Sequence, residues 1–351
     1  MLEKFFKLSE NHTDAKTEIL AGITTFMTMA YILAVNPSIM AATGMDSGAV
    51  FTATALAAFI GTLLMAIFAN YPFALAPGMG LNAYFAYTVV IGMGYTWQYA
   101  LTAVFAEGII FILLSLTNVR EAIFNAIPMN LKSAVSVGIG LFIAFVGLQN
   151  AHIVVGGSTL LQLFSVDAYN KANGVEASFN NVGITVILAL AGIIITGILV
   201  VKNIKGNILW GILITWGLGI ICQFAGLYVP NADLGFYSLL PDFSKGLSIP
   251  SLTPIFGKLQ FKGIFSVDFI VILFAFLFVD LFDTIGTLVG VSAKADMLDE
   301  EGKLPHIKGA LLADAVATTV GAILGTYTSI TFVDCVFGVS DGGCIGFTAF
   351  T

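Results

Sequence analysis

Long stretches without a single charged residue dominate this chain. Segments 48–69, 182–201 and 207–228 each hold about 20 residues that are apolar, small or uncharged. A helix of that length crosses the roughly 30 Å hydrocarbon core of a bilayer. Only 10% of the 351 residues are charged, whereas soluble domains contain roughly 25%. The sequence therefore predicts an all-α polytopic membrane protein, with most of its surface in lipid.

Hydropathy along the chain predicts about ten membrane segments. Nine read as helices, and the tenth is interrupted by glycines and a charge. They lie near 18–37, 48–70, 78–94, 98–117, 133–149, 182–201, 207–228, 264–291, 308–325 and 329–351. We divide the chain accordingly into an N-terminal segment, seven spans, a long loop and an incomplete second set of spans: 1–17, 18–228, 229–263 and 264–351.

The distribution of cations predicts the orientation. With the N-terminus in the cytoplasm, ten of the 14 lysines and arginines fall on the inner side. They are Lys4, Lys7, Lys16, Arg120, Lys132, Lys202, Lys205, Lys294, Lys303 and Lys308, against Lys171, Lys245, Lys258 and Lys262 outside. Inner loops of membrane proteins carry this excess. We therefore expect a multi-pass protein of the cell membrane with a cytoplasmic N-terminus.

The third span contains a break, in the stretch NYPFALAPGMGLNAYFAY (70–87). Prolines suit the first turn of a helix, so Pro77 and Gly78 predict the start of a half-helix after an extended piece at 73–76. The backbone N–H groups at such a start can bind electronegative groups. Asn82, one turn later, offers a donor and an acceptor. The alternative is an ordinary Pro-Gly turn between two helices.

The tenth segment is broken in a similar way. Alternation through 329–332 predicts a short extended piece, and a glycine-rich turn follows at 341–343. Phe332 is placed to stack on a flat ring, or simply to pack in the core or against lipid. Asp334 is a candidate acceptor for ring N–H groups, or a cap for the following helix.

The spacing of the two breaks suggests an internal repeat. The second break lies seven spans after the first, and an odd offset reverses orientation, as inverted-repeat carriers require. Non-helical backbone at membrane depth is tolerated only where protein or a water-filled cavity satisfies its polar groups. Two broken spans and one acidic helix therefore predict a transporter of the inverted-repeat type, with seven spans in each repeat and its site near the membrane midplane.

The acidic helix is FLFVDLFDTIGTLVG (276–290). Asp283 shares a helical face with Gly286 and Gly290, a G-x-x-x-G pair that allows close helix contact. A carboxylate at the bilayer centre costs roughly 2.5–3.5 kcal/mol on insertion scales. We expect Asp283 to bind the ligand or a proton, and Asp280 to act as a tether for a neighbouring helix or as a proton relay.

The remaining reactive residues indicate little chemistry. Glu107 in the fourth span has a functional and a structural interpretation of equal weight. The three cysteines and three histidines show no spacing typical of metal ligands. No phosphate-binding glycine loop and no nucleophile with a base is evident. We expect no enzyme activity, no metal, no cofactor and no nucleic-acid partner.

Four motifs together resemble one family. DAKTEILAGITTFMTMAYILAVNP, ALAPGMGLNAYFAY, GIGLFIAFVGLQNAHIV and FVDLFDTIGTLVG are similar to the adenine/guanine/hypoxanthine permeases. These form the AzgA-like branch of the nucleobase–cation symporter-2, or xanthine/uracil permease, family. The resemblance implies fourteen spans in two inverted repeats of seven, broken spans three and ten, proton-coupled uptake of purine bases, and a possible homodimer.

The resemblance also implies site residues. Asp283 falls where an eighth-span acid contacts the base, and Gly80 and Asn82 match the third-span binding motif. Phe332 matches an aromatic that packs on the ring, and Asp334 stands where the family has Glu. The proton is expected on Asp283 or Asp280.

The chain departs from the family pattern near its end. Cys335 and Cys344 stand in place of Ser and Arg, and Ile345 in place of Thr. The sequence stops within or just after span ten, so we expect a fragment or a truncated product that lacks about four spans. The leading hypothesis is a purine nucleobase:proton symporter. An anion carrier of related fold and an intramembrane aspartyl protease are the alternatives.

Overall fold

The computed structural model is largely helical and separates into two compact units, which are described in turn. Unit 1 comprises Met1–Gly140 and Ile249–Thr351, and unit 2 comprises Leu141–Ser248. The structure describes residues 6–117, 119–157, 160–202, 204, 206–231, 234–240, 248–299, 304–305 and 307–351.

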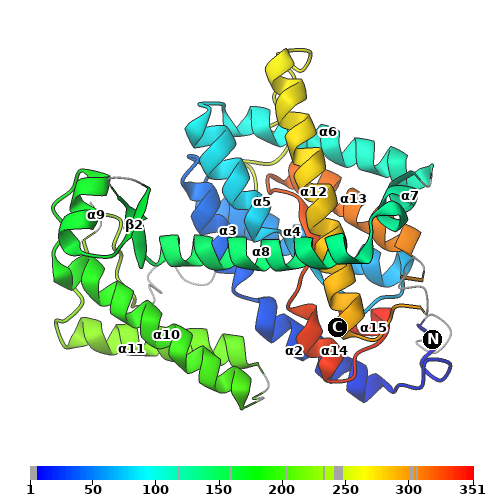
Figure 1. Cartoon of the computed structure of the whole chain (residues 1–351), viewed down its shortest axis with the longest axis horizontal. Coiled ribbons are helices and arrows are strands. Elements are labelled where there is room, and N and C mark those ends of the chain that lie inside the picture. The colour runs from blue at the N-terminus through cyan, green and yellow to red at the C-terminus, as the bar shows by residue number, and fades with distance from the viewer. Residues whose placement is uncertain are drawn as a thin grey trace. The chain divides into compact units, whose positions relative to one another are not determined.

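Unit 1 is built from helices and two short strands (Figure 1). Its first part contains α2 (Ala15–Met29), α3 (Ile32–Ala41), α4 (Ser47–Phe68), β1 (Leu75–Pro77), α5 (Met79–Ala83), the π-helix η1 (Tyr84–Gly92), α6 (Trp97–Leu116) and α7 (Val119–Ala126). Its second part contains α12 (Val267–Lys294), α13 (Ile307–Leu324), β4 (Ser329–Thr331), α14 (Cys335–Ser340) and α15 (Gly346–Phe350). Helix α8 (Met129–Asn150) begins in unit 1 and ends in unit 2.

Hydroxyl and carboxylate side chains fix where these helices begin. The side chains of Asp14, Asp46, Thr96 and Ser266 accept backbone hydrogen bonds at the starts of α2, α4, α6 and α12. Such caps satisfy N–H groups that have no partner within the helix. These four helices therefore begin at a polar residue that caps the first turn.

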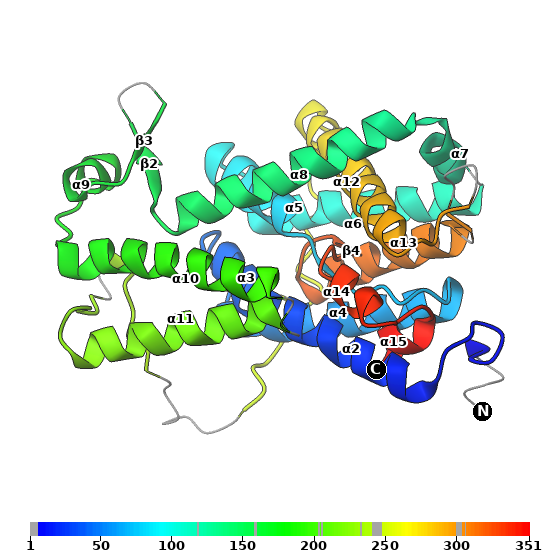
Figure 2. The same ribbon diagram turned by 60° about the horizontal axis from the view of Figure 1, so that its bottom comes forward.

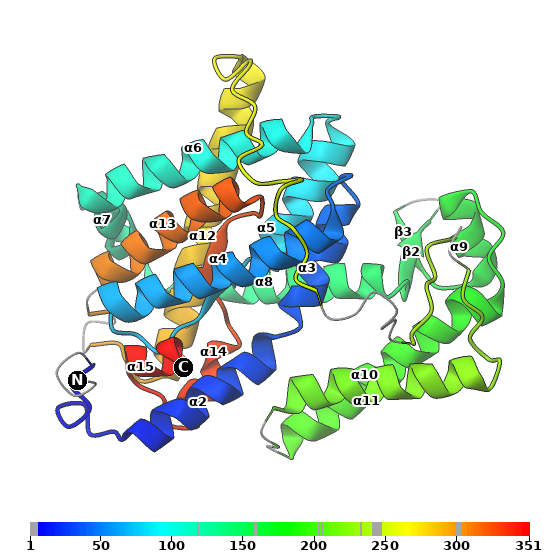
Figure 3. The ribbon, with the colours of Figure 1, turned by 180° about the vertical axis from the view of Figure 1, so that it is seen from behind.

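The nine segments predicted as helical spans are confirmed as helical, and the tenth contains β4, α14 and α15. Seven helices in the described residues are long and apolar enough to cross a membrane, and Met79–Gly92 and Gly140–Asn150 are shorter apolar helices. The predicted first span, 18–37, is two helices, α2 and α3. Helix α13 packs between α6 and α4, as Figure 3 shows from behind. Helix α12 packs against α6 and β4 and carries the acidic face towards the interior.

Both predicted breaks are confirmed, and they meet. Strand β1 of span three pairs with β4 of span ten in an antiparallel sheet, with Ala76 opposite Ile330. One detail was wrong: Pro77 does not start the half-helix but ends the strand, opposite Ser329, and Gly78 precedes α5. The fixed φ of proline suits extended backbone as well as a first helical turn. The inverted repeat itself stays a prediction, although antiparallel pairing is what two inverted copies would produce.

Unit 2 contains the rest of α8, a small hairpin and two apolar helices. Its elements are β2 (Val154–Gly156), β3 (Leu161–Leu163), α9 (Val166–Asn173), the π-helix η2 (Phe179–Gly183), α10 (Ile184–Val201) and α11 (Asn207–Phe224). Helices α10 and α11 pack side by side, as Figure 2 shows. The sequence did not predict the hairpin or α9, because short elements in a connecting loop leave little hydrophobic periodicity.

Some predictions concern residues outside the described part of the chain. The start of segment 1–17 and part of loop 229–263 fall there, as do Lys4, Lys205, Lys245, Lys303 and His306. The division into 1–17, 18–228, 229–263 and 264–351 follows the expected repeats and stays a prediction. The two compact units do not follow this division, because unit 1 contains spans from both expected repeats.

Candidate functional site

The two broken spans satisfy each other's backbone. Beyond the paired strands, the N–H of Gly78 donates to the carbonyl of Thr328 at 3.1 Å, and the N–H of Phe332 donates to the carbonyl of Ala74 at 3.0 Å. Cys335 Sγ accepts from the N–H of Ala74 at 3.1 Å. Unpaired backbone groups in lipid cost several kcal/mol each. The strand pair therefore lets two helices stop and restart in the interior of unit 1.

Asp283 lies beside the strand pair formed by β1 and β4. It is 5% exposed on the buried face of α12, and its Oδ1 receives no hydrogen bond from the described residues. A Cβ atom placed on Gly78 would lie 3.6 Å from Asp283 Oδ2 and 2.8 Å from Ile330 Cδ1. The carboxyl group of Asp283 thus adjoins the start of α5, where Gly78 has no side chain that would crowd it. Its Oδ1 is a buried acceptor that has no donor among the described residues.

Asp280, one turn earlier on α12, has a different environment. It is fully buried, and the hydroxyl of Thr284 lies 3.3 Å from its Oδ1. Its side chain also interacts with that of Glu107 on α6. Asp280 Oδ1 thus has a neighbouring hydroxyl, whereas Asp283 Oδ1 has no donor among the described residues. The expected roles of Asp280 as a tether or proton relay and of Asp283 in binding the ligand or a proton stay predictions.

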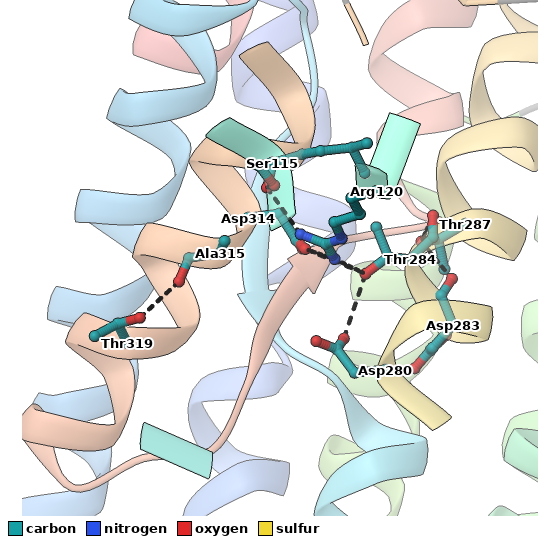
Figure 4. A network of polar contacts seen from close by, with 10 residues as sticks. Ser115, Arg120, Asp280, Asp283, Thr284, Thr287, Asp314, Ala315 and Thr319 are labelled. Carbon is teal, nitrogen blue, oxygen red and sulfur yellow. Dashed lines mark hydrogen bonds and ion pairs between the residues drawn. The ribbon is translucent and has the colours of Figure 1, made fainter. Parts of the chain in front are cut away.

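A buried ion pair completes the network. Arg120 Nη2 lies 2.6 Å from Asp314 Oδ2, and both side chains are 0% exposed. Arg120 also donates to the carbonyl of Leu311 at 2.8 Å, and its guanidinium lies 4.0 Å from the centroid of the Phe111 ring. Figure 4 shows Thr284 between Asp314 and Asp280, with its hydroxyl 3.3 Å from each. Helices α7, α12 and α13 are joined through these groups.

The sequence interpretation missed two members of this network. Asp314 is the only charged residue of segment 309–324, and that isolation in an apolar helix was the available signal. Arg120 was expected among cytoplasmic loop cations, but its side chain is fully buried. Its short loop, next to an apolar span, gave no indication that it turns inward.

Asn82 is held by a second polar cluster. Its Nδ2 donates to Asn36 Oδ1 at 2.6 Å, and Asn36 Nδ2 donates to Thr54 at 2.7 Å and to Thr326 at 2.9 Å. All four side chains are fully buried. Asn82 Oδ1 receives no hydrogen bond from the described residues. The amide nitrogen of Asn82 thus fixes α5 to α3, whereas its amide oxygen is left without a donor among the described residues.

The other predicted site residues lie along the same two spans. Gly80 is in the first turn of α5, and its carbonyl accepts from the N–H of Tyr84. Phe332 is buried, with its ring 6.2 Å from that of Tyr31. Asp334 does not cap α14 with its side chain; its Oδ2 accepts from the Tyr31 hydroxyl at 3.0 Å.

The structure does not gather all six predicted residues at one point. Asp283 adjoins Gly78, at one end of the strand pair, whereas Asp334 follows its opposite end. The predicted G-x-x-x-G contact was wrong at Gly290, which is exposed, although Gly286 is buried. Thr284 and Thr287, which lie on either side of Gly286 in the sequence, are both buried.

Comparison with known proteins gives one consistent result. A family model described as "Permease family", for xanthine and uracil permeases, matches residues 16–344. The guanine/hypoxanthine permease PbuO of Bacillus subtilis is 43% identical over 349 residues, covering 99% of this chain and 74% of that protein. The adenine permease AdeP of Escherichia coli is 37% identical over 350 residues, covering 99% and 72%.

A solved structure has a related fold. The transmembrane domain of the cyanobacterial bicarbonate transporter BicA matches with a TM-score of 0.63 at 16% identity, covering 95% of this chain and 79% of that one. At this identity the likeness concerns the fold alone. It confirms the expected polytopic helical architecture.

Proposed function

Because the chain belongs to the xanthine/uracil permease, or nucleobase–cation symporter-2, family, we propose that it is a transporter that carries purine nucleobases across the cell membrane together with protons. The observation that carries the proposal is the buried carboxylate of Asp283 beside the start of α5, whose Oδ1 has no donor among the described residues. A buried acceptor left unsatisfied costs about 1–3 kcal/mol. A ligand with ring N–H groups would supply the missing donor.

The other predicted residues fit a flat ligand with polar edges. A purine lying across the strand pair would reach Asp283 at one end and Asp334 at the other, so that both accept ring N–H groups. The free Oδ1 of Asn82 and the backbone of the first turn of α5, at Gly80, would contact the edge. Phe332 would pack on the ring face, as aromatic side chains do with planar ligands.

Proton coupling gives a role to the acids of α12. We assign the coupled proton to Asp283 or Asp280. We further propose that the N-terminus is cytoplasmic, that transport proceeds by alternating access, and that the carrier can form a homodimer. Buried carboxyl groups in membrane helices commonly serve as proton carriers. The relatives that the chain matches are transporters, which supports a carrier rather than an enzyme.

An anion carrier is the second candidate, since a bicarbonate transporter has a related fold. The site argues against it. Arg120, the cation in the described network, is already paired with Asp314 at 2.6 Å. Glu107, Asp280 and Asp283 would repel an anion. An aspartyl protease is disfavoured by the permease family itself.

Binding of labelled hypoxanthine to the purified protein tests the proposal. Loss of a hydrogen bond to a charged group, worth about 1.5–3 kcal/mol, predicts that Asp283→Asn weakens binding roughly 10- to 100-fold. Asp268→Asn is the matched control, because Asp268 lies on the same helix but is exposed. Equal affinity of Asp283→Asn and the unaltered protein would sink the assignment.

A further inference from the structure

Two fully buried carboxyl groups lie against each other on neighbouring helices. Glu107 of α6 and Asp280 of α12 are both 0% exposed, α6 packs against α12, and the two carboxyl groups lie close enough to interact with each other. An ionised carboxylate accepts hydrogen bonds and cannot donate them. A hydrogen bond between these two groups therefore requires a proton on one of them.

The surroundings provide little else to satisfy these oxygens. Written as carboxylates, both oxygens of Glu107 and Oδ2 of Asp280 receive no hydrogen bond from any described residue. Within the part of the chain that the structure describes, Oδ1 of Asp280 has one donor nearby, the Thr284 hydroxyl at 3.3 Å. Two adjacent ionised carboxylates repel strongly in a low-dielectric interior. One shared proton removes the repulsion and supplies a donor at once.

The charges around the pair lead to the same conclusion. Asp314, Arg120 and Asp283 all interact electrostatically with Asp280, and the Tyr327 hydroxyl interacts with both Glu107 and Asp280. The single cation of this group, Arg120, is already engaged by Asp314. No positive charge in the described network is therefore left to balance Glu107 and Asp280.

We propose that Glu107 and Asp280 together bind one exchangeable proton, and that this is the proton carried with the purine, while Asp283 binds the base. The proposal rests on the proposed function and narrows it, because it removes the proton from Asp283 and adds a residue of the fourth span. Release of the proton leaves two like charges in contact, so it favours separation of α6 from α12. Proton release is thereby tied to a change of packing in unit 1.

Infrared difference spectroscopy tests the shared proton directly, without transport. A pH change applied to the purified protein should reveal a carboxylic-acid band that shifts in D2O. The same band should disappear in Glu107→Gln and, separately, in Asp280→Asn, because the proton needs both groups. It should persist in Asp283→Asn and in Asp268→Asn. A band unaffected by Glu107→Gln overturns the proposal.

Transport in liposomes tests the coupling. We expect the ratio of pH-gradient-driven accumulation to exchange of labelled hypoxanthine to fall at least tenfold in Glu107→Gln, with partial recovery in Glu107→Asp. A ratio equal to that of the unaltered protein contradicts the inference. If the unaltered protein exchanges no purine, the proposed function fails instead, and the infrared experiment still decides whether the pair holds a proton.

Discussion

Arg120 and Asp314 form a salt bridge of 2.6 Å with no exposed surface on either side chain. The guanidinium comes from the short helix α7 and the carboxylate from the middle of α13. The pair fixes the place where α7 meets the interior of unit 1, and it orients Thr284 next to Asp280. It is thus a support for the acidic face of α12 rather than a part of the proposed purine contact.

Removing one partner of this pair should destabilise the protein strongly. Breaking a buried pair leaves an uncompensated charge and costs about 3–5 kcal/mol. We expect Asp314→Leu and Arg120→Leu each to lower the thermal unfolding temperature. The decrease in the double variant should be smaller than the sum of the decreases in the two single variants. Lys7→Ala is the control, since Lys7 and Glu10 form an exposed pair at 3.1 Å that is worth at most about 1 kcal/mol. Additive effects of the two leucine variants would show that the pair is not coupled.

Glu18 joins the first span to the end of the tenth. Its fully buried carboxylate accepts from the backbone N–H groups of Cys344 at 3.2 Å and Ile345 at 3.4 Å, and from the hydroxyls of Thr13 and Thr348. Glu18→Ala would leave these donors without an acceptor, which should lower the free energy of unfolding by about 1–3 kcal/mol. Hydrogen exchange at 344–348 should accelerate. Glu18→Gln, which keeps one acceptor oxygen, should have a smaller effect, and equal exchange in Glu18→Ala would contradict the role.

Gly78 should be intolerant of a side chain for a functional reason. A Cβ there would meet Ile330 Cδ1 at 2.8 Å and approach Asp283 Oδ2 to 3.6 Å. Such overpacking costs about 1–3 kcal/mol, and we expect hypoxanthine binding by Gly78→Ala to weaken about tenfold. Gly138→Ala is the matched control, because no atom of the described residues lies within 4 Å of a Cβ at Gly138. Unchanged affinity in Gly78→Ala would separate Gly78 from the site.

The buried environment of the His152 ring leads us to expect that the stability of unit 2 depends on pH. Its ring lies 5.0 Å from that of Tyr169 and 6.0 Å from that of Phe236, and burial lowers its pKa. The unfolded chain then binds this proton more readily than the folded one. The free energy of unfolding should therefore fall as the pH drops below the ordinary imidazole pKa of about 6.5.

Thermal unfolding followed by tryptophan fluorescence, at about pH 7.5 and 5.5, measures this effect. Trp210 and Trp216 lie in α11 of the same unit. His152→Phe keeps an aromatic ring but cannot titrate, so its pH dependence should be smaller than that of the unaltered protein. An identical pH dependence would assign the loss of stability to other groups.

The spans and both breaks were predictable because they depend on local sequence. Uncharged runs specify helices at membrane depth, and proline and glycine at 77–78 interrupt one of them. The pairing of 75–77 with 329–331 was not predictable, since antiparallel register between distant segments leaves no local signal. The same holds for Arg120, which reads as a loop cation until α13 places Asp314 beside it. The roles of Asp283, Asp334, Asn82, Gly80 and Phe332 in binding stay predictions.

The strand pair also has a consequence for biosynthesis. Ala74 and Cys335, which hydrogen-bond at this crossing, are 261 residues apart in the chain. Span three therefore emerges from the ribosome long before the segment that satisfies its backbone. During that interval its open peptide groups must be kept from lipid by water, by the insertion machinery or by a temporary partner. The assembly of unit 1 is thus governed by the arrival of its last described strand.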